Sequence, residues 1–465
     1  MTKRPLYSFG LACLLLAGPV FYCRAEEVRS DTVLMDLPSI YRLADEQSRT
    51  IRISETALRA AEEGVRQAKN NLLPHVSVDL SGSYIGDATL LSRGFSRTGN
   101  TEVILPGLGP QSVPNGRQSS PHWGNMLSVD ATQVIYAGGA LSAGVELAKL
   151  GERMAELDVA KSRQEVRFML TGYYLDLVRL GNQIAVIDNH IELTQEVLGQ
   201  MRSREKVGVV LHNDITRYEL QLQQLLLTRV RLNDARDIIS HQLATALHLT
   251  QGAAIIPDTV PLAKEYAALQ DAVREDIWQS GASGSNLMIR QAEAGEKISE
   301  QQVKVTRAAS IPTIAAVIKD QLFGPYTTDL IPVNANVNAW YVGIGLHYDL
   351  GSIWHNRRSI RKARVELENA REKTELVREN IDNQVHAAYV NFLTAFTDVE
   401  TQRKQVQLAD ENYAVVQKRY DNDLALLTDL LDASSMKLQA DMALVNARIG
   451  LLYDYYQLKY ITHTL

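Results

Sequence analysis

GYYLDL at residues 172–177 and AAYVNF at residues 387–392 occupy the same place in two similar halves of the chain. Their residue numbers differ by 215 (387 − 172), and the same interval relates Asp214 to Asp429. An interval this long is that of a duplicated half, because solenoid units repeat every 20 to 50 residues or so. We therefore predict an internal two-fold repeat.

Each of these stretches lies in a long, proline-free run with helical periodicity, Leu141 to Lys206 in one half and Arg358 to Tyr420 in the other. At 1.5 Å per residue, about 65 residues make a rod of roughly 100 Å. The apolar seam of each run has heptad spacing, which predicts that the rods pack lengthwise as coiled coils. The first seam consists of Tyr173, Leu177, Leu180, Ile184, Ile187 and Ile191. The second consists of Ala388, Phe392, Ala395, Val399 and Val406, and only Gln402 interrupts it. For the helices alone, an ordinary coiled-coil dimer is the alternative.

The two halves contain the same elements in the same order: helix, strand, loop, strand, long helix, turn, helix. We predict helices at 37–71, 141–206 and 214–249 with strands at 73–84 and 126–136, then helices at 287–308, 358–420 and 428–460 with strands at 311–322 and 339–350. The repeats span residues 26–249 and 287–465, and a Gly-, Pro- and Ser-containing linker at 250–286 joins them.

Four segments alternate apolar and polar residues with the period of a strand, and each has about the 9–11 residues of a tilted membrane strand. Their apolar positions are Val76, Val78, Leu80 and Tyr84; Leu127, Val129 and Ala131; Ile314, Ala316 and Ile318; and Trp340, Val342, Ile344, Leu346 and Tyr348. Four strands cannot close a barrel, and an open sheet edge is not tolerated in hydrocarbon. Several chains must therefore contribute strands to one transmembrane β-barrel. Aromatic residues near the strand ends suit a girdle at the lipid interface, or ordinary strand preference.

Residues 1–25 have the pattern of a secretory signal peptide: Lys3 and Arg4, a short apolar run, and a cleavage site after Ala25. A lipid anchor on Cys23 is the alternative, although the large Tyr22 precedes it. Cleavage would remove both cysteines of the chain, which excludes a disulfide, a thiolate metal site and a cysteine nucleophile. It would also move the net charge from −6 to −9 (−6 − 3), which gives no sign of nucleic-acid binding.

The sequence resembles the TolC family of outer-membrane efflux and secretion channels. The resemblance lies in Ala61 to Pro74, QVIYAGG at 133–139, Tyr173-Tyr174, the turn 208–214, RYDNDL at 419–424 and TDLLDA at 428–433. It implies a homotrimer with a twelve-stranded β-barrel in the outer membrane, four strands per protomer, continued by a long α-helical coiled-coil barrel across the periplasm. It also implies a periplasmic adaptor (membrane fusion) protein and an inner-membrane pump of the RND or ABC type as partners.

The resemblance assigns roles near the two turns that end the long helices. Asp429 and Asp432 match the paired aspartates that line the periplasmic constriction of such channels, where they would form acidic rings. The alternative is helix capping, with Asp429 as N-cap and Asp432 in the first turn. Both residues share a helix face because they are three apart.

Tyr420 and Asp214 match positions that hold the entrance shut, with surface packing as the alternative. The arginine that helps lock such entrances is absent from this turn, where Ala425 stands. Gly208 and Asp423 lie in the tip turns that an adaptor would contact. Asp423 departs from the glycine usual in the second turn, and aspartate reaches positive φ less readily.

No acid/base pair, nucleophile or cofactor loop stands out in the sequence, so we predict no enzyme and no cofactor. The predicted function is an α+β membrane channel for export across the periplasm and outer membrane. The alternative is a periplasmic coiled-coil structural or adaptor protein, which has no need of lipid-facing alternation in its strands.

Overall fold

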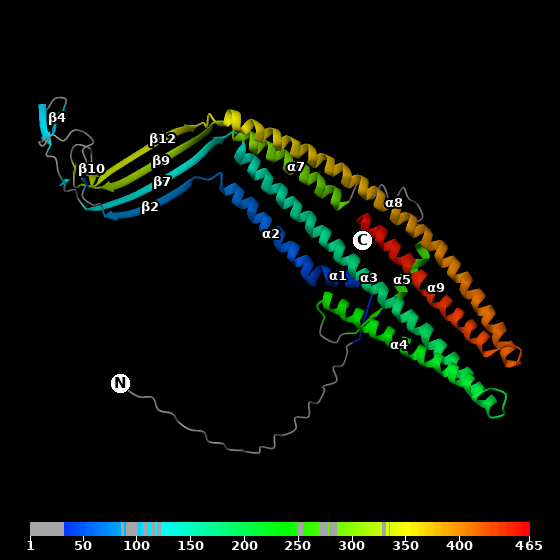
Figure 1. Cartoon of the computed structure of the whole chain (residues 1–465). Coiled ribbons are helices and arrows are strands. Elements are labelled where there is room, and N and C mark those ends of the chain that lie inside the picture. The colour runs from blue at the N-terminus through cyan, green and yellow to red at the C-terminus, as the bar shows by residue number, and fades with distance from the viewer. Residues whose placement is uncertain are drawn as a thin grey trace, which may run out of the picture.

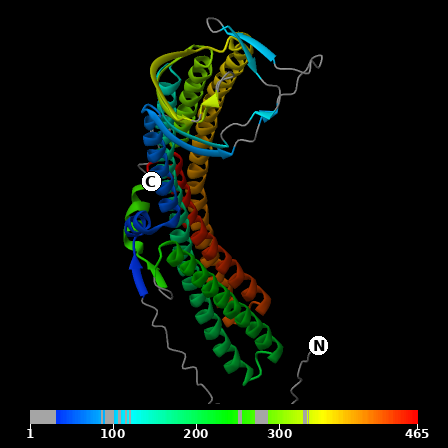
Figure 2. The same ribbon diagram turned by 90° about the vertical axis from the view of Figure 1, so that its left-hand side faces the viewer.

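The computed structural model describes residues 32–84, 88–89, 101–105, 109–113, 117–118, 122–249, 254–269, 278, 286–327, 332–333 and 335–465. The predicted signal peptide lies outside these residues. Figure 1 shows a sheet at one end of the molecule and long helices that extend from it to two tips. Turned by 90°, the sheet is strongly curved and the helices form a shaft beneath it (Figure 2).

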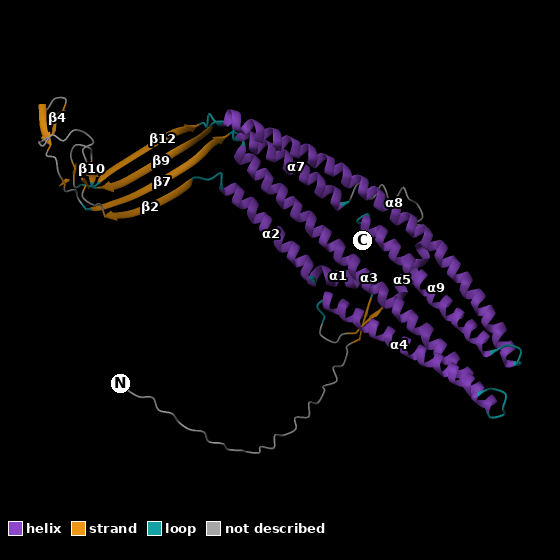
Figure 3. Ribbon diagram, viewed as in Figure 1, coloured by secondary structure: helices purple, strands orange, loops and turns teal. Residues whose placement is uncertain are grey.

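The main sheet has four antiparallel strands in the order β12-β9-β7-β2 (Figure 3). They are β2 (His75–Tyr84), β7 (Trp123–Ala137), β9 (Thr313–Gly324) and β12 (Val337–His347). Smaller pairs are β1 (Thr32–Met35) with β8 (Ala254–Pro257), β3 (Ala88–Thr89) with β6 (Arg117–Gln118), β4 (Thr101–Leu105) with β5 (Gly109–Val113), and β10 (Tyr326–Thr327) with β11 (Pro332–Val333).

The register of the main sheet keeps apolar and polar residues on opposite faces, as the alternation predicts. Directly opposed residues share a face, and one row joins Val76, Ala131, Ile318 and Val342. The next row joins Ser77, Asp130, Lys319 and Tyr341, and Lys319 Nζ lies 3.0 Å from Asp130 Oδ1. The apolar face is bare in the single chain, where Leu80 is 80% and Ile344 76% exposed.

Eight helices have described bounds: α1 (Leu37–Gln47), α2 (Arg49–Asn70), α3 (Ala140–Glu205), α4 (His212–Ala246), α5 (Thr259–Ala268), α7 (Leu287–Ala308), α8 (Ser352–Asp421) and α9 (Leu427–Ile461). The predicted rods are α3, with 66 residues, and α8, with 70. Leu177, Ile187, Phe392 and Val399 of the predicted seams are at most 2% exposed, so the seams do form the packing faces. Within the described residues, no helix is both long enough and apolar enough to span a membrane.

The single helix predicted over 37–71 is wrong, because Ser48 interrupts it between α1 and α2 with an extended ψ of 127°. The break lets α1 turn its apolar face, including Ile40 and Ala44, into a core that it shares with α3. The predicted linker, 250–286, contains two elements that were not predicted, β8 and α5. β8 pairs in parallel with β1, which lies at the N-terminal end of the first half of the chain. These elements form a waist around the middle of the helical shaft (Figure 1).

Candidate functional site

The two tip turns have the same backbone. After α3, the amide of Gly208 donates to the carbonyl of Glu205 and that of Val209 to Arg204; after α8, Asp423 donates to Tyr420 and Leu424 to Arg419. This pair of bonds is the Schellman ending of a helix, which needs a left-handed residue at its centre. Gly208 has φ +80° and Asp423 has φ +59°. Asp423 therefore keeps the turn, although a side chain at positive φ costs roughly 1–2 kcal/mol.

Arg204, in the last turn of α3, joins the first tip to the second. Its guanidinium lies 2.5 Å from Asp423 Oδ1. It also donates to the carbonyl oxygens of Tyr420, at 3.3 Å, and Asp421, at 3.1 Å, and its centre lies 5.7 Å from the Tyr420 ring centroid. An arginine of the first half of the chain thus contacts the turn in which Ala425 stands, a contact that the sequence pattern did not indicate. Nothing in the local sequence distinguishes Arg204 from Arg202.

The structure brings Tyr420 and Asp214 together at the same tip. Burial raises the pKa of Tyr420; the Arg204 guanidinium opposes that rise, and the Asp214 carboxylate adds to it. Tyr420 packs against a tip core that includes Tyr218 and Leu430, which are 1% and 0% exposed. Burial also raises the pKa of Tyr218, so both phenols keep their protons at neutral pH.

Asp429 and Asp432 lie in the first turns of α9, both exposed and on the side away from the buried Leu427, Leu430 and Ala433. The prediction that Asp429 is the N-cap of this helix is wrong, because the N-cap lies three residues earlier. Leu426 is the N-cap, and Asp429 is the third helical residue, whose Oδ2 accepts the Leu426 amide at 3.0 Å. Leucine offers no capping side chain, so the carboxylate reaches back to the orphan amide instead. Asp429 therefore stabilises the helix start and still presents its charge to solvent.

A polar network ties the helices together above the tip. His190 Nε2 of α3, with a side chain only 4% exposed, lies 3.1 Å from Asp441 Oδ2 of α9. Lys437 lies 3.7 Å from the same oxygen and also pairs with Asp410 of α8. A buried polar group is costly unless it has a partner, so this network fixes the register of α3, α8 and α9. Among the described residues, no three His, Cys, Asp or Glu side chains are grouped as metal ligands would be.

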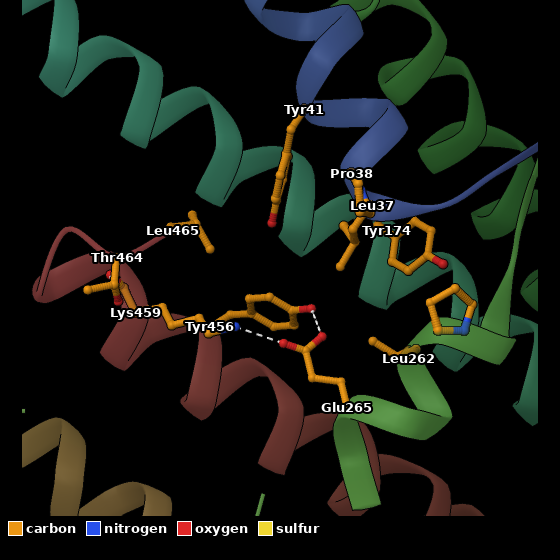
Figure 4. A pocket seen from close by; sticks show the side chains of 11 residues that line it. Leu37, Pro38, Tyr41, Tyr174, Leu262, Glu265, Tyr456, Lys459, Thr464 and Leu465 are labelled. Carbon is orange, nitrogen blue, oxygen red and sulfur yellow. Dashed lines mark hydrogen bonds and ion pairs between the residues drawn. The ribbon is translucent and has the colours of Figure 1, made fainter. Parts of the chain in front are cut away.

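At the waist, a cavity of about 220 Å³ lies between α1, α3, α5 and α9. Figure 4 shows Tyr456 and Lys459 of α9 pointing toward Glu265 of α5. Tyr456 Oη donates to Glu265, Lys459 Nζ lies 2.8 Å from Glu265 Oε1, and the same Nζ lies 4.4 Å from the Tyr455 ring centroid. On the other side, Tyr174 Oη donates to the Asp258 carbonyl at 2.5 Å.

Tyr41, Tyr456 and Lys459 of the waist keep their protons at neutral pH. Burial raises the pKa of Tyr41 to about 12. Burial and the bond to Glu265 both raise the pKa of Tyr456. Burial lowers the pKa of Lys459, but Glu265 and Tyr455 outweigh that effect and leave it above its usual value. The ion pair and its neutral phenol donor therefore form a clamp that joins α5 of the middle segment to α9.

Comparison with known proteins agrees with this architecture. Residues 278–462 match the family described as outer membrane efflux protein. The outer membrane protein TolC of Salmonella enteritidis is 18% identical over 438 residues, which cover 92% of this chain and 82% of TolC.

Three solved outer-membrane proteins, two of them described as channels, have the same fold over 92% of this chain. VceC of Vibrio cholerae has a TM-score of 0.71 at 14% identity, with 95% of its own chain covered. CmeC of Campylobacter jejuni has a TM-score of 0.68 at 14% identity, with 85% of its own chain covered. MtrE of Neisseria gonorrhoeae has a TM-score of 0.66 at 15% identity, with 88% of its own chain covered. The chain thus has a match to the outer membrane efflux protein domain in its second half, a relative in TolC along most of its length, and the fold of these outer-membrane proteins.

Proposed function

We propose that three copies of this protein form one passive export duct. As an outer-membrane efflux protein, the chain is the outer-membrane channel component of a tripartite efflux system and extends into the periplasm. In the proposed trimer, each protomer gives four strands to one transmembrane β-barrel, and the helices continue it as a coiled-coil barrel.

The observation that carries the trimer is the open sheet. Among the described strands, β2 and β12 each have one partner only, and the apolar face between them is bare. An unpaired strand edge is costly in lipid, and four strands are too few to close a barrel. Further copies of the same chain satisfy both requirements, with outer-membrane lipid against the apolar face. The periplasmic adaptor alternative is not favoured, because it leaves this face without a purpose.

The proposed trimer is built from two repeats, at 26–249 and 287–465, on either side of the segment 250–286. The lengths of the helices support this duplication. Both α4 and α9 have 35 residues, and the numbers of their first residues differ by 215 (427 − 212). Both α2 and α7 have 22 residues, and the numbers of their first residues differ by 238 (287 − 49).

The tips are the proposed periplasmic entrance. Asp429 and Asp432 would form acidic rings that narrow it and favour cations, while Tyr420, Asp214 and Arg204 hold the neighbouring helix pairs together. The turns at Gly208 and Asp423 are the proposed contacts of a periplasmic adaptor, which would connect the duct to an inner-membrane pump of the RND or ABC type. The family is one of channels, and we propose that this member has no catalytic activity and needs no cofactor.

The trimer is tested by purifying the protein from outer-membrane fractions and measuring its mass by light scattering in detergent. We expect the protein in the outer-membrane fraction, with a protein mass three times that of the mature chain. A stable monomer, or a protein found only in the soluble periplasmic fraction, would refute the shared barrel.

A further inference from the structure

The free edges of the protomer lie on opposite sides of the sheet and shaft. β2 and α2 form one side, and β12 and α8 the other (Figures 1 and 2). Beyond β12, the start of α8 carries an exposed strip, while Asn356 of the same helix donates to the Thr306 carbonyl of α7 at 2.8 Å. The strip holds two large apolar residues and a basic cluster: Ile353, Trp354, Arg357, Arg358, Arg361 and Lys362.

The chain contains a template for what covers these edges. The interval of 238 in residue number carries β2 onto β9, and the interval of 215 carries β7 onto β12. The hairpin registers agree with both: His75 opposes Thr132, and their counterparts Thr313 (75 + 238) and His347 (132 + 215) oppose each other. A positive φ also recurs at the interval of 215 (463 − 248): it is 52° in His248 and 55° in His463. The contact of β7 with β9 inside one protomer is thus equivalent to a contact of β12 with the β2 of a second copy.

We propose that β12 of one protomer pairs antiparallel with β2 of the next in the register that β7 and β9 display. The inference rests on the proposed trimer and specifies its interface. Ala131 opposes Ile318, which places Leu346 (131 + 215) opposite Leu80 (318 − 238) of the next protomer. Thr132 opposes Val317, which places His347 opposite Asp79.

This register continues both faces of the sheet around the ring. Leu346 and Leu80 extend the apolar face. His347 and Asp79 fall on the face that holds the Asp130–Lys319 ion pair, where opposite charges oppose each other across strands. A slip of one residue would put every side chain of the edge strand on the wrong face.

The helices beside the two edges carry exposed charged residues at a similar distance from the sheet. Arg361 lies nine residues beyond the start of α8 (361 − 352), and Glu63 lies seven residues before the end of α2 (70 − 63). Glu63 is exposed and faces away from Val65, which is 6% exposed. Glu63 already pairs with Arg66 of α2 at 2.6 Å, so the register rests on the strands and not on the charges of these helices.

Disulfide trapping tests the register directly, because Cys13 and Cys23, in the predicted signal peptide, are the only cysteines of the chain. The pair Gly345→Cys with Ser81→Cys occupies the positions equivalent to Asp130 and Lys319. A Cβ atom at Gly345 meets no atom closer than 4.0 Å. Matched pairs are Gly345→Cys with Ser83→Cys and Gly345→Cys with Ser77→Cys, which report a shift of two or four residues along the same face.

We expect about tenfold more inter-protomer disulfide for the Ser81 pair, because opposed Cβ atoms lie about 4.5–5.5 Å apart and diagonal ones about 7–8 Å. The pair His347→Cys with Asp79→Cys reports the same register should the first variant fail to assemble. If the variants are trimers by light scattering but the Ser83 or Ser77 pair cross-links best, the register is wrong. If the parent protein is monomeric and no pair cross-links, the proposed trimer itself fails.

Discussion

Replacing Arg204 by methionine is expected to open the entrance and raise its open probability about tenfold. The guanidinium contacts Asp423, Tyr420 and Asp421 across the two tips. Its side chain is 24% exposed, but that of Asp423 is 67% exposed, so solvent weakens the ion pair. Loss of the charged hydrogen bonds should cost about 1–2 kcal/mol, and about 1.36 kcal/mol is a factor of ten in an equilibrium. Single-channel recording in planar bilayers measures the change.

The neighbouring Arg202 offers a matched control. It pairs with Glu219 at 2.7 Å, inside the α3–α4 pair, and makes no described contact with the second tip. Arg202→Met removes the same charge from the same helix end and should leave the open probability unchanged. Asp423→Asn should give a smaller rise than Arg204→Met, since asparagine tolerates positive φ and the two carbonyl contacts remain. Equal open probability in Arg204→Met and the parent protein would show that Arg204 does not hold the entrance.

Replacing both Asp429 and Asp432 by asparagine is expected to abolish most of the cation preference of the duct and its block by divalent cations. Three chains would bring six carboxylates to the entrance, where they attract cations and bridge divalent ions. Asparagine keeps an oxygen that accepts the Leu426 amide, so the start of α9 should persist. Reversal potentials in a salt gradient, with and without a divalent cation on the periplasmic side, measure both effects.

The pair Asp234→Asn with Asp237→Asn is the control for total charge. These aspartates have the same spacing but lie in the second half of α4, away from the tip. They should leave selectivity and divalent block as in the parent protein. If the change at Asp429 and Asp432 has no larger effect than this control, the two residues serve the helix start alone.

The features that depend on repeated local patterns were predictable from the sequence. The seam through Leu177 and Phe392 predicted the long helices, because heptad spacing repeated over many turns has few other interpretations. The alternation from Val76 to Tyr84 predicted which face of its strand is apolar, because the period of a strand fixes the face of each residue.

Features set by contacts distant in sequence were not predictable. β1 and β8 have four residues each, too few to show a period. The break at Ser48 follows from the packing of α1 onto α3. Helix α9 begins directly after Leu426, whose side chain cannot cap a helix, so the sequence favoured Asp429 as the N-cap. The role of Arg204 depends on a partner 219 residues away, Asp423.

Single-channel recording on the purified trimer tests the export duct most directly. With trimeric protein added to a planar bilayer and no pump, adaptor or nucleotide present, we predict discrete current steps that are cation-selective and become more frequent in Arg204→Met. Trimeric protein that inserts into the bilayer but passes no current, in either the parent protein or Arg204→Met, would contradict a passive channel through the shared barrel.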